Sequence, residues 1–241
     1  MSIPECIAID GPAASGKSTV ANKISQKIGY LYFDTGVMYR AVTWLTLRHE
    51  VSFGDENAVS ALAENIPIDV NPPSVADGRD CDIFVEGEDI TWKIRLPEVD
   101  ANVSIVSVYP GVRAALTAQQ RRIGLQGQVV MVGRDIGTMV LPEAELKIYL
   151  DASAKERARR RYQERLERGE EADFEVILEN VRRRDKIDST REVAPLKAAK
   201  DAVIIDTNDL TIEDVLAEVE RLISQFEKAK SKKSPYGDVP R

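Results

Sequence analysis

The stretch IAIDGPAASGKST (residues 7–19) constrains the fold of this chain more than any other part of the sequence. Gly11, Gly16, Lys17 and Ser18 match the pattern G-x-x-x-x-G-K-[ST], between an apolar run typical of a strand and a helical pattern. Glycine lets backbone N–H groups approach phosphate oxygens without a Cβ in the way. The stretch therefore predicts a phosphate-binding loop rather than an ordinary glycine turn. Lys17 would reach the β- and γ-phosphates of a nucleoside triphosphate, and Ser18 would coordinate Mg²⁺.

Short apolar runs alternate with helical patterns along the rest of the chain. The runs cover residues 6–10, 31–34, 129–133, 146–152 and 202–206. One helical pattern follows the glycine-rich stretch and ends near residue 28. The others cover residues 36–49, 55–65, 98–125, 153–191 and 211–228. Five such runs predict an α/β fold of the P-loop NTPase type, with a five-stranded parallel sheet covered by helices on both faces. Ligands of such sheets bind beyond the carboxyl ends of the strands.

Residues 66–97 interrupt this alternation, because they are rich in Pro, Asp and Gly and contain short alternating runs such as DIFVEG. We interpret them as a small β-insertion. Within it, Gly78, Arg79 and Asp80 repeat a tripeptide found at 133–135, but no strand precedes them. They are interpreted as a solvated turn.

The overall charge excludes some functions. The 241 residues carry 33 basic and 40 acidic side chains, a net charge of −7, so no general attraction to nucleic acid or to an anionic membrane is expected. Cys6 and Cys81 lie far apart without metal-ligand spacing, so neither a disulfide framework nor a zinc site is expected. The first residues lack a basic region followed by an apolar run, and no stretch is long and apolar enough to span a bilayer. We expect a soluble, cytoplasmic protein.

A second anion site is predicted after the second strand. In YFDTGVMYR (32–40), Asp34 and Thr35 stand where a helix would be capped, and Tyr39 and Arg40 follow one turn later. Hydroxyl, N–H and guanidinium groups could converge on a phosphate. Taken alone, a capped helix with an exposed arginine explains this stretch better. The anion site gains weight only with the next motif.

That motif is GRDIGT, in which Gly133, Arg134 and Asp135 end a buried strand. Charged groups at such a point are costly unless they have partners. A pair facing a ligand and an internal salt bridge both satisfy this requirement.

The region 153–191 is rich in arginine, but Glu and Asp are interleaved with it, so most of it is expected to be a solvated, ion-paired helix pair. Arg184, Asp188 and Arg191 differ, because their spacing places them on one face of a continuing helix. They suit a clamp over a phosphorylated substrate, or they pair with each other. Glycine within ERGEEAD (167–173) predicts a turn between the two helices, as a mobile flap would need.

Together these motifs resemble those of nucleoside monophosphate kinases, most closely the bacterial cytidylate kinase family. The likeness covers nearly the whole chain. It is carried by DGPAASGKST, DTGVMYR, GEDIT, GRDIGT, KIYLDAS and VAPL. The resemblance implies transfer of the γ-phosphoryl group of MgATP to CMP or dCMP, giving ADP and CDP or dCDP, in pyrimidine nucleotide metabolism. The alternatives are a kinase for another small acceptor, such as UMP, AMP or an alcohol, and a P-loop NTPase switch. The absence of an N-K-x-D run argues against a GTP switch.

The resemblance also implies roles for individual residues. ATP would contact Gly11, Pro12, Ala13, Ala14, Ser15, Gly16, Lys17, Ser18, Thr19 and Arg157. The acceptor phosphate would be held by Thr35, Tyr39, Arg40 and Arg134, and the cytosine edge would be read by Ser104, Arg113 and Asp135. Asp188 would contact the ribose, and the catalytic cations would be Lys17, Arg134, Arg184 and Arg191. Relatives often carry an acidic residue where this chain has Val132, which leaves carboxylate assistance to Mg²⁺ open at that position.

The implied organisation divides the chain into four parts. These are a core ATP-binding domain (1–35, 98–152 and 192–228), a monophosphate-binding region (36–97, with the insertion 66–97), a lid (153–191) and a disordered tail (229–241). We expect a monomer whose partners are ATP and CMP or dCMP, with neither nucleic acid nor membrane.

Overall fold

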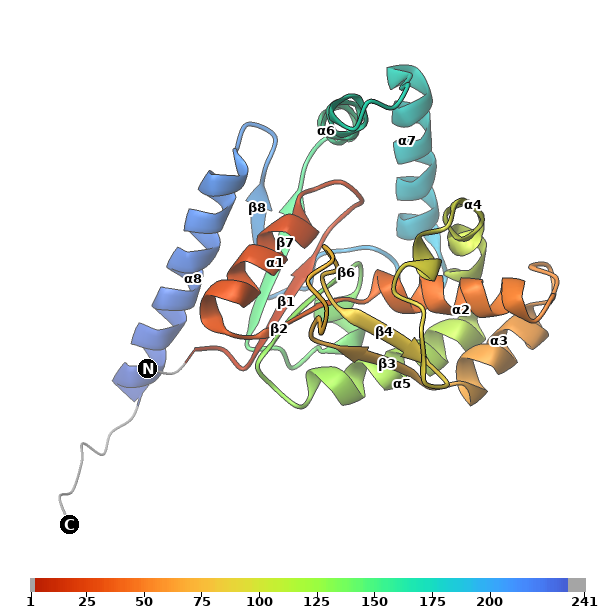
Figure 1. Cartoon of the computed structure of the whole chain (residues 1–241). Helices are drawn as coiled ribbons and strands as arrows, with labels where there is room; N and C mark the ends of the chain where they lie inside the picture. Colours follow the sequence, from red (N-terminus) through yellow and green to blue (C-terminus); the bar gives the residue numbers. More distant parts are fainter. Residues whose placement is uncertain (1–2, 234–241) are drawn as a thin grey trace, which may run out of the picture.

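A five-stranded parallel sheet forms the centre of the computed structural model, in which residues 3–233 are described (Figure 1). The strand order is β2-β6-β1-β7-β8. The strands are β1 (Cys6–Asp10), β2 (Leu31–Asp34), β6 (Val129–Gly133), β7 (Leu146–Asp151) and β8 (Val203–Asp206). All four neighbouring pairs are parallel, so the predicted α/β sheet is confirmed.

Helices cover both faces of this sheet because its strands are apolar on both sides. Ile7 and Ile9 of β1 pack against α1 (Lys17–Ile28) and α8 (Ile212–Lys233), whereas Ala8 joins the core on the opposite face. That opposite core contains α2 (Gly36–Arg48), α3 (Glu56–Asn65) and α5 (Pro110–Gly124). Figure 1 shows α8 on one side of the sheet and α2 and α3 on the other. Successive strand residues point to opposite faces, which gives the two cores.

Two predicted helix boundaries are wrong. The helix expected over 98–125 is two helices, α4 (Pro97–Val106) and α5, and α5 begins at Pro110. Proline lacks an N–H and is compatible with a first helical turn but not with a helix interior, so the chain breaks there. At the other end, α8 continues to Lys233, so the disorder expected from 229 is wrong for 229–233. Residues 234–241 of the predicted tail lie outside the described residues.

The insertion is an antiparallel sheet of β3 (Ile68–Asn71), β4 (Asp82–Val85) and β5 (Glu88–Asp89), followed by the short helix η1 (Lys93–Arg95). The solvated turn expected at residues 78–80 is wrong for Arg79, because only 6% of its side chain is exposed, whereas Gly78 and Asp80 are exposed. Its guanidinium pairs with Asp77, Asp82 and Asp89 at 2.8, 2.9 and 2.7 Å. Arg79 therefore holds the insertion together.

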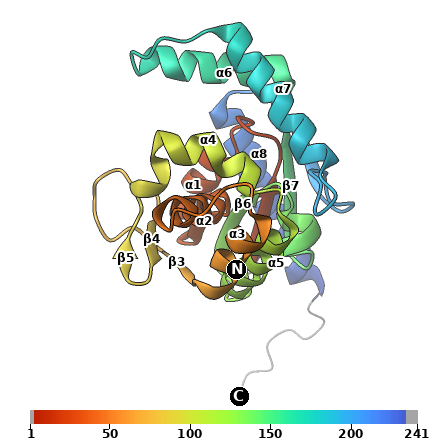
Figure 2. The same ribbon diagram turned by 90° about the vertical axis from the view of Figure 1, so that its right-hand side faces the viewer.

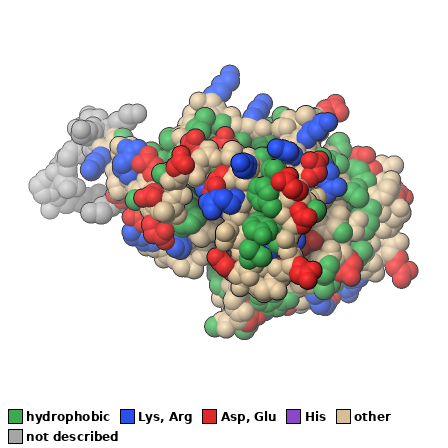
Figure 3. Space-filling view, turned by 90° about the horizontal axis from the view of Figure 1, so that it is seen from above, with side chains coloured by type: hydrophobic (Ala, Val, Ile, Leu, Met, Phe, Trp, Pro, Cys, Tyr) green, Lys and Arg blue, Asp and Glu red, His purple; other side chains and the backbone are tan. Residues whose placement is uncertain are grey.

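The helix pair expected over 153–191 is present as α6 (Ala154–Glu167) and α7 (Phe174–Thr190), which project above the sheet in both ribbon views (Figures 1 and 2). Gly169, with φ of 73°, lies in the turn between them. Ala158, Ile177, Leu178 and Val181 form an apolar core within the pair. Seen from above, basic and acidic side chains are interspersed on the surface (Figure 3). No helix within residues 3–233 is both long and apolar enough to cross a bilayer.

Candidate active site

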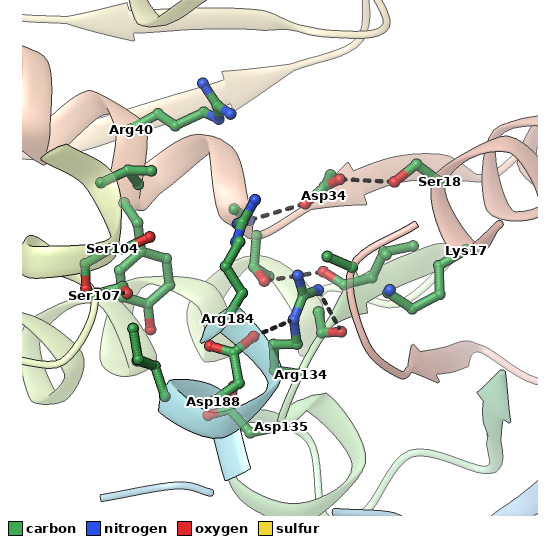
Figure 4. Close-up of a pocket in the computed structure, with 18 of the residues that line it drawn as sticks. Lys17, Ser18, Asp34, Arg40, Ser104, Ser107, Arg134, Asp135, Arg184 and Asp188 are labelled. Atoms are coloured by element: carbon green, nitrogen blue, oxygen red, sulfur yellow. Dashed lines mark hydrogen bonds and ion pairs between the residues drawn. The ribbon is translucent and has the colours of Figure 1, made fainter. Parts of the chain in front are cut away.

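A cavity of about 320 Å³ lies at the carboxyl ends of the strands, between the phosphate loop and α7 (Figure 4). All ten residues predicted to bind the acceptor line it: Thr35, Tyr39, Arg40, Ser104, Arg113, Arg134, Asp135, Arg184, Asp188 and Arg191. Four residues of the predicted ATP site also line it: Ala13, Ala14, Lys17 and Ser18. The other residues predicted for ATP, Gly11, Pro12, Ser15, Gly16, Thr19 and Arg157, are not part of its wall. Segments distant in the sequence thus meet at one site.

The phosphate loop has a backbone that requires glycine. Gly11 has φ of 146°, and a Cβ there would lie 2.1 Å from the Leu150 carbonyl oxygen of β7. Gly16 has φ of 89° and directly precedes α1, whose positive end faces the cavity. The Lys17 ammonium donates to the Pro12 carbonyl at 2.5 Å and to the Ser15 hydroxyl at 3.3 Å. Burial holds the pKa of Lys17 well below its ordinary value.

Asp34 is a site residue that sequence reasoning treated only as a helix cap. Its Oδ1 accepts from the Gly36 N–H at 2.9 Å, as a cap would, but its Oδ2 accepts from the Ser18 hydroxyl at 3.0 Å. The register of β2 and β6 sets Asp34 beside Val132. The position of Asp34 at the end of a strand was the available signal.

At the start of α2, two predicted phosphate ligands have protein partners. The Thr35 hydroxyl does not cap the helix but donates to the Val132 carbonyl at 2.9 Å. Arg40 pairs with Asp100 at 2.5 Å and donates to the Ile94 carbonyl at 3.2 Å. Tyr39 is buried, which raises the pKa of its phenol to about 12. The helix therefore carries an arginine that is ion-paired and also faces the cavity.

Arg134 and Asp135 also have charged protein partners, although they do not pair with each other. The Asp135 carboxylate accepts from Arg113 at 2.6 Å and from Arg191 at 3.3 Å. Arg134 donates to the Asp188 carboxylate at 3.0 Å. The salt-bridge alternative is therefore confirmed, with partners other than each other. Both residues also line the cavity, and their contact with a ligand stays a prediction.

Arg184 and Asp188 both lie on α7, as predicted, but Arg191 does not. The helix ends at Thr190, so Arg191 follows it in extended conformation, with its guanidinium 3.8 Å from the Asp188 carboxylate. Figure 4 shows Arg184 extending into the cavity. Burial, with Arg134 nearby, lowers the pKa of Arg184. Arg161 of α6 is a further wall residue to which sequence reasoning gave no role.

A buried carboxylate supports the segment that carries Arg134 and Asp135. Asp10, at the end of β1, is 3% exposed and accepts from the Ile136 and Gly137 N–H groups at 2.8 and 2.7 Å. Burial raises its pKa to about 6. In the sequence Asp10 looked like the end of an apolar strand, so this role was not predicted.

The cavity wall is strongly positive. Its basic side chains are Lys17, Arg40, Arg113, Arg134, Arg161, Arg184 and Arg191, and its acidic ones are Asp34, Asp135 and Asp188. This excess suits ligands that carry several phosphate groups. A phosphate loop, a second group of basic side chains in the same cavity and a helix pair bearing arginines are the features of P-loop kinases.

Comparisons with known proteins agree with that class. The family model described as "Cytidylate kinase" matches residues 7–225, and the chain belongs to this family of nucleoside monophosphate kinases. A protein named "Cytidylate kinase" from Bacillus licheniformis is 47% identical over 91% of this chain and 96% of its own length. One of the same name from Geobacillus sp. (strain WCH70) is 49% identical, with the same coverage.

A solved structure, a gluconokinase from Sinorhizobium meliloti 1021, shares the fold with a TM-score of 0.50 and 14% identity. The match covers 97% of this chain and 99% of that one.

Proposed function

We propose that this chain transfers the γ-phosphoryl group of MgATP to the 5′-phosphate of CMP or dCMP, giving ADP and CDP or dCDP in pyrimidine nucleotide metabolism. Names of relatives and membership in the cytidylate kinase family support the activity. The observation that carries the proposal is the single cavity, because the phosphate loop and every predicted acceptor residue line it together. Two nucleotides bound there would meet phosphate to phosphate.

At the donor end, residues 11–19 would hold the triphosphate and Ser18 would ligate Mg²⁺. Ser18 and Asp34 supply a hydroxyl and a carboxylate 3.0 Å apart at the cavity, the oxygen ligands that Mg²⁺ prefers. Within residues 3–233 no three acidic, His or Cys side chains form a metal cage, so phosphates and water would complete the ligand set. The bound ion would supply positive charge to the β- and γ-oxygens.

The role of Asp34 has its own test. Replacing Asp34→Asn should raise the Mg²⁺ concentration for half-maximal activity, at saturating ATP and CMP, by about tenfold. Asp69→Asn, at an exposed position of β3 in the insertion, is the matched control and should leave that concentration unchanged. An unaltered Mg²⁺ requirement in Asp34→Asn would remove the carboxylate from the metal site.

At the acceptor end, Arg40 and Arg134 would hold the phosphate of CMP. Arg40 would exchange Asp100 for that phosphate, and Thr35 would have to leave the Val132 carbonyl to donate to it. Asp135 would accept from the N4 amino group of cytosine, and Arg113 and Ser104 would donate to O2 or N3. The ribose would contact Asp188.

Catalysis would rest on alignment and positive charge. The acceptor oxygen of a phosphate is already anionic near neutral pH, so a strong general base is not required. Lys17, Arg134, Arg184 and Arg191 would surround the transferring group, and Arg161 would add a fifth cation.

Closure of α6 and α7 would exclude water from this reaction. A second cavity of about 640 Å³ separates α4 from the helix pair, with the half-exposed Ile105 and Val176 in its walls. Bringing these walls together would bury apolar surface, which favours the closed state.

Coupled ADP release, measured with CMP, dCMP, UMP and AMP in parallel and without acceptor, tests the proposal. Rapid release with CMP and dCMP is expected, with slower release for UMP and AMP. Faster turnover with UMP would identify a kinase for another acceptor, and release independent of acceptor would identify an NTPase switch. The cytoplasmic location, the monomeric state and the absence of nucleic-acid and membrane partners stay predictions.

A further inference from the structure

A buried arginine connects the phosphate loop to the lid. Arg157 lies in the first turns of α6, and 4% of its side chain is exposed. Its Nε donates to the Ala152 carbonyl at 2.9 Å, and its Nη1 donates to the carbonyl of Ala13, in the phosphate loop, at 3.1 Å. The same guanidinium forms a two-point pair with Asp185 of α7, at 3.0 and 2.5 Å. One rigid group thus contacts the sheet edge, the loop and the lid.

Asp185 lies on α7 next to Arg184 and one turn before Asp188. Those two neighbours line the active-site cavity, whereas Asp185 does not. Its carboxylate faces Arg157 instead. Neighbouring residues of one helix therefore serve two places: Arg184 faces the cavity, and Asp185 contacts the arginine that is bonded to the phosphate loop. A shift of Asp185 would move Arg184 and Asp188 with it, because a helix moves as a rigid element.

The base of α6 is fixed to the sheet by a separate contact. Arg160 donates to the hydroxyl of Thr207 at 3.2 Å and to its carbonyl, and Thr207 is buried directly after β8. The Thr207 hydroxyl in turn donates to the Asp151 carbonyl of β7 at 3.0 Å. With this end of α6 anchored, the pair of Arg157 with Asp185 sets how α7 lies above the loop.

We propose that Arg157 and Asp185 form a strut that couples nucleotide binding in the phosphate loop to the position of α7. Triphosphate binding orders the loop around its phosphates, and the Ala13 carbonyl then fixes Arg157. Arg157 holds Asp185 through the planar, two-point geometry of a guanidinium and a carboxylate, which transmits orientation as well as attraction. Asp185 is therefore a positioning residue for Arg184 and Asp188, and Arg157 has this role beside its predicted contact with ATP. The inference rests on the proposed function.

The test measures the affinity of CMP by calorimetry with and without a β,γ-imido analogue of ATP. In the unchanged chain the analogue should tighten CMP binding by about fivefold or more. In Asp185→Asn, CMP alone should bind within about twofold of the unchanged chain, and the tightening should fall below about twofold. Glu164→Gln is the matched control, because Glu164 pairs with Arg168 on the exposed part of α6, and it should keep the full coupling.

Three results would overturn the strut. They are no coupling in the unchanged chain, full coupling in Asp185→Asn, and equal weakening of CMP binding with and without the analogue. Thermal unfolding shows whether Asp185→Asn is folded; if it is not, Arg157→Lys takes its place, because lysine keeps the charge but cannot make the two-point pair. Since Arg157 is also predicted to contact ATP, the analogue is then used at a concentration that saturates this variant. A chain that binds no CMP at all contradicts the proposed function instead.

Discussion

The two ends of the cavity are built differently. The donor end is a contiguous loop shaped by backbone, with positive φ at Gly11 and Gly16 and a helix N-terminus behind it. The acceptor end is assembled from side chains of five separate segments, and most of its charges already have protein partners, such as Asp188 for Arg134. In the backbone site the loop already has its shape, and only Lys17 would have to leave the Pro12 carbonyl to reach a phosphate. A site of paired side chains must exchange partners when its ligand arrives, which allows it to discriminate.

The largest effect is expected at the donor end. Lys17→Ala should lose at least about 10²-fold in kcat, because one charge-stabilising group is removed from the transferring phosphoryl group. Coupled ADP release with saturating CMP measures it. Lys23→Ala is the control on the same helix, since Lys23 is exposed and forms a long pair with Glu213 at 3.5 Å. Near-normal turnover in Lys17→Ala would break the assignment of this loop to the γ-phosphate.

The backbone character of the donor end is tested by glycine. Gly11→Ala should lower the free energy of unfolding by about 3 kcal/mol, because its Cβ would overlap the Leu150 carbonyl oxygen. Gly78 also has positive φ, at 90°, but a Cβ there would meet no other atom within 4 Å. Gly78→Ala should therefore lower the free energy of unfolding by only about 1 kcal/mol. Urea unfolding measures both. Equal losses would show that close approach to β7 does not shape the loop.

Discrimination at the acceptor end depends on Asp135. In Asp135→Asn the ratio of kcat/KM for CMP to that for UMP should fall by about tenfold or more, because an amide N–H repels the N4 amino group of cytosine but suits O4 of uracil. Glu143→Gln, which breaks the surface pair with Arg121, should keep the ratio. An unchanged base preference in Asp135→Asn would exclude this carboxylate as the cytosine reader.

The smallest effect concerns Asp10, beneath both ends. Its pKa of about 6 lies above the ordinary 3.8, so the folded chain keeps a proton that the unfolded chain has lost. Its contribution to stability is present at low pH and is lost as pH rises through 6, about 1 kcal/mol between pH 5 and 7. Lys17 and Asp135 are the charged groups facing it.

Urea unfolding at the two pH values should show this loss in the unchanged chain, and Asp10→Asn should lack it. The same pH dependence in both proteins would show that a group other than Asp10 causes the loss of stability.

The contrast between the two ends also explains what the sequence predicted. Strands such as 129–133 were predicted correctly because every residue is apolar and buried on both faces. The phosphate loop was predictable because its residues are contiguous. Arg79, Asp10 and Asp185 were not, because each takes its role from partners that only the folded chain brings near. Arg79 looked exposed because aspartates surround it in the sequence, but three of them are its ion-pair partners in the fold. The break at Pro110 was missed although proline marks it, since apolar periodicity continued on both sides.

Binding of a bisubstrate analogue, in which a polyphosphate chain joins adenosine to cytidine, tests the central account most directly. If the donor loop and the acceptor arginines serve one reaction, the analogue should bind at least about 10²-fold more tightly than either ATP or CMP and compete with both. Lys17→Ala and Asp135→Asn should each weaken it. An analogue that binds no more tightly than ATP and leaves CMP binding unaffected would contradict a shared cavity.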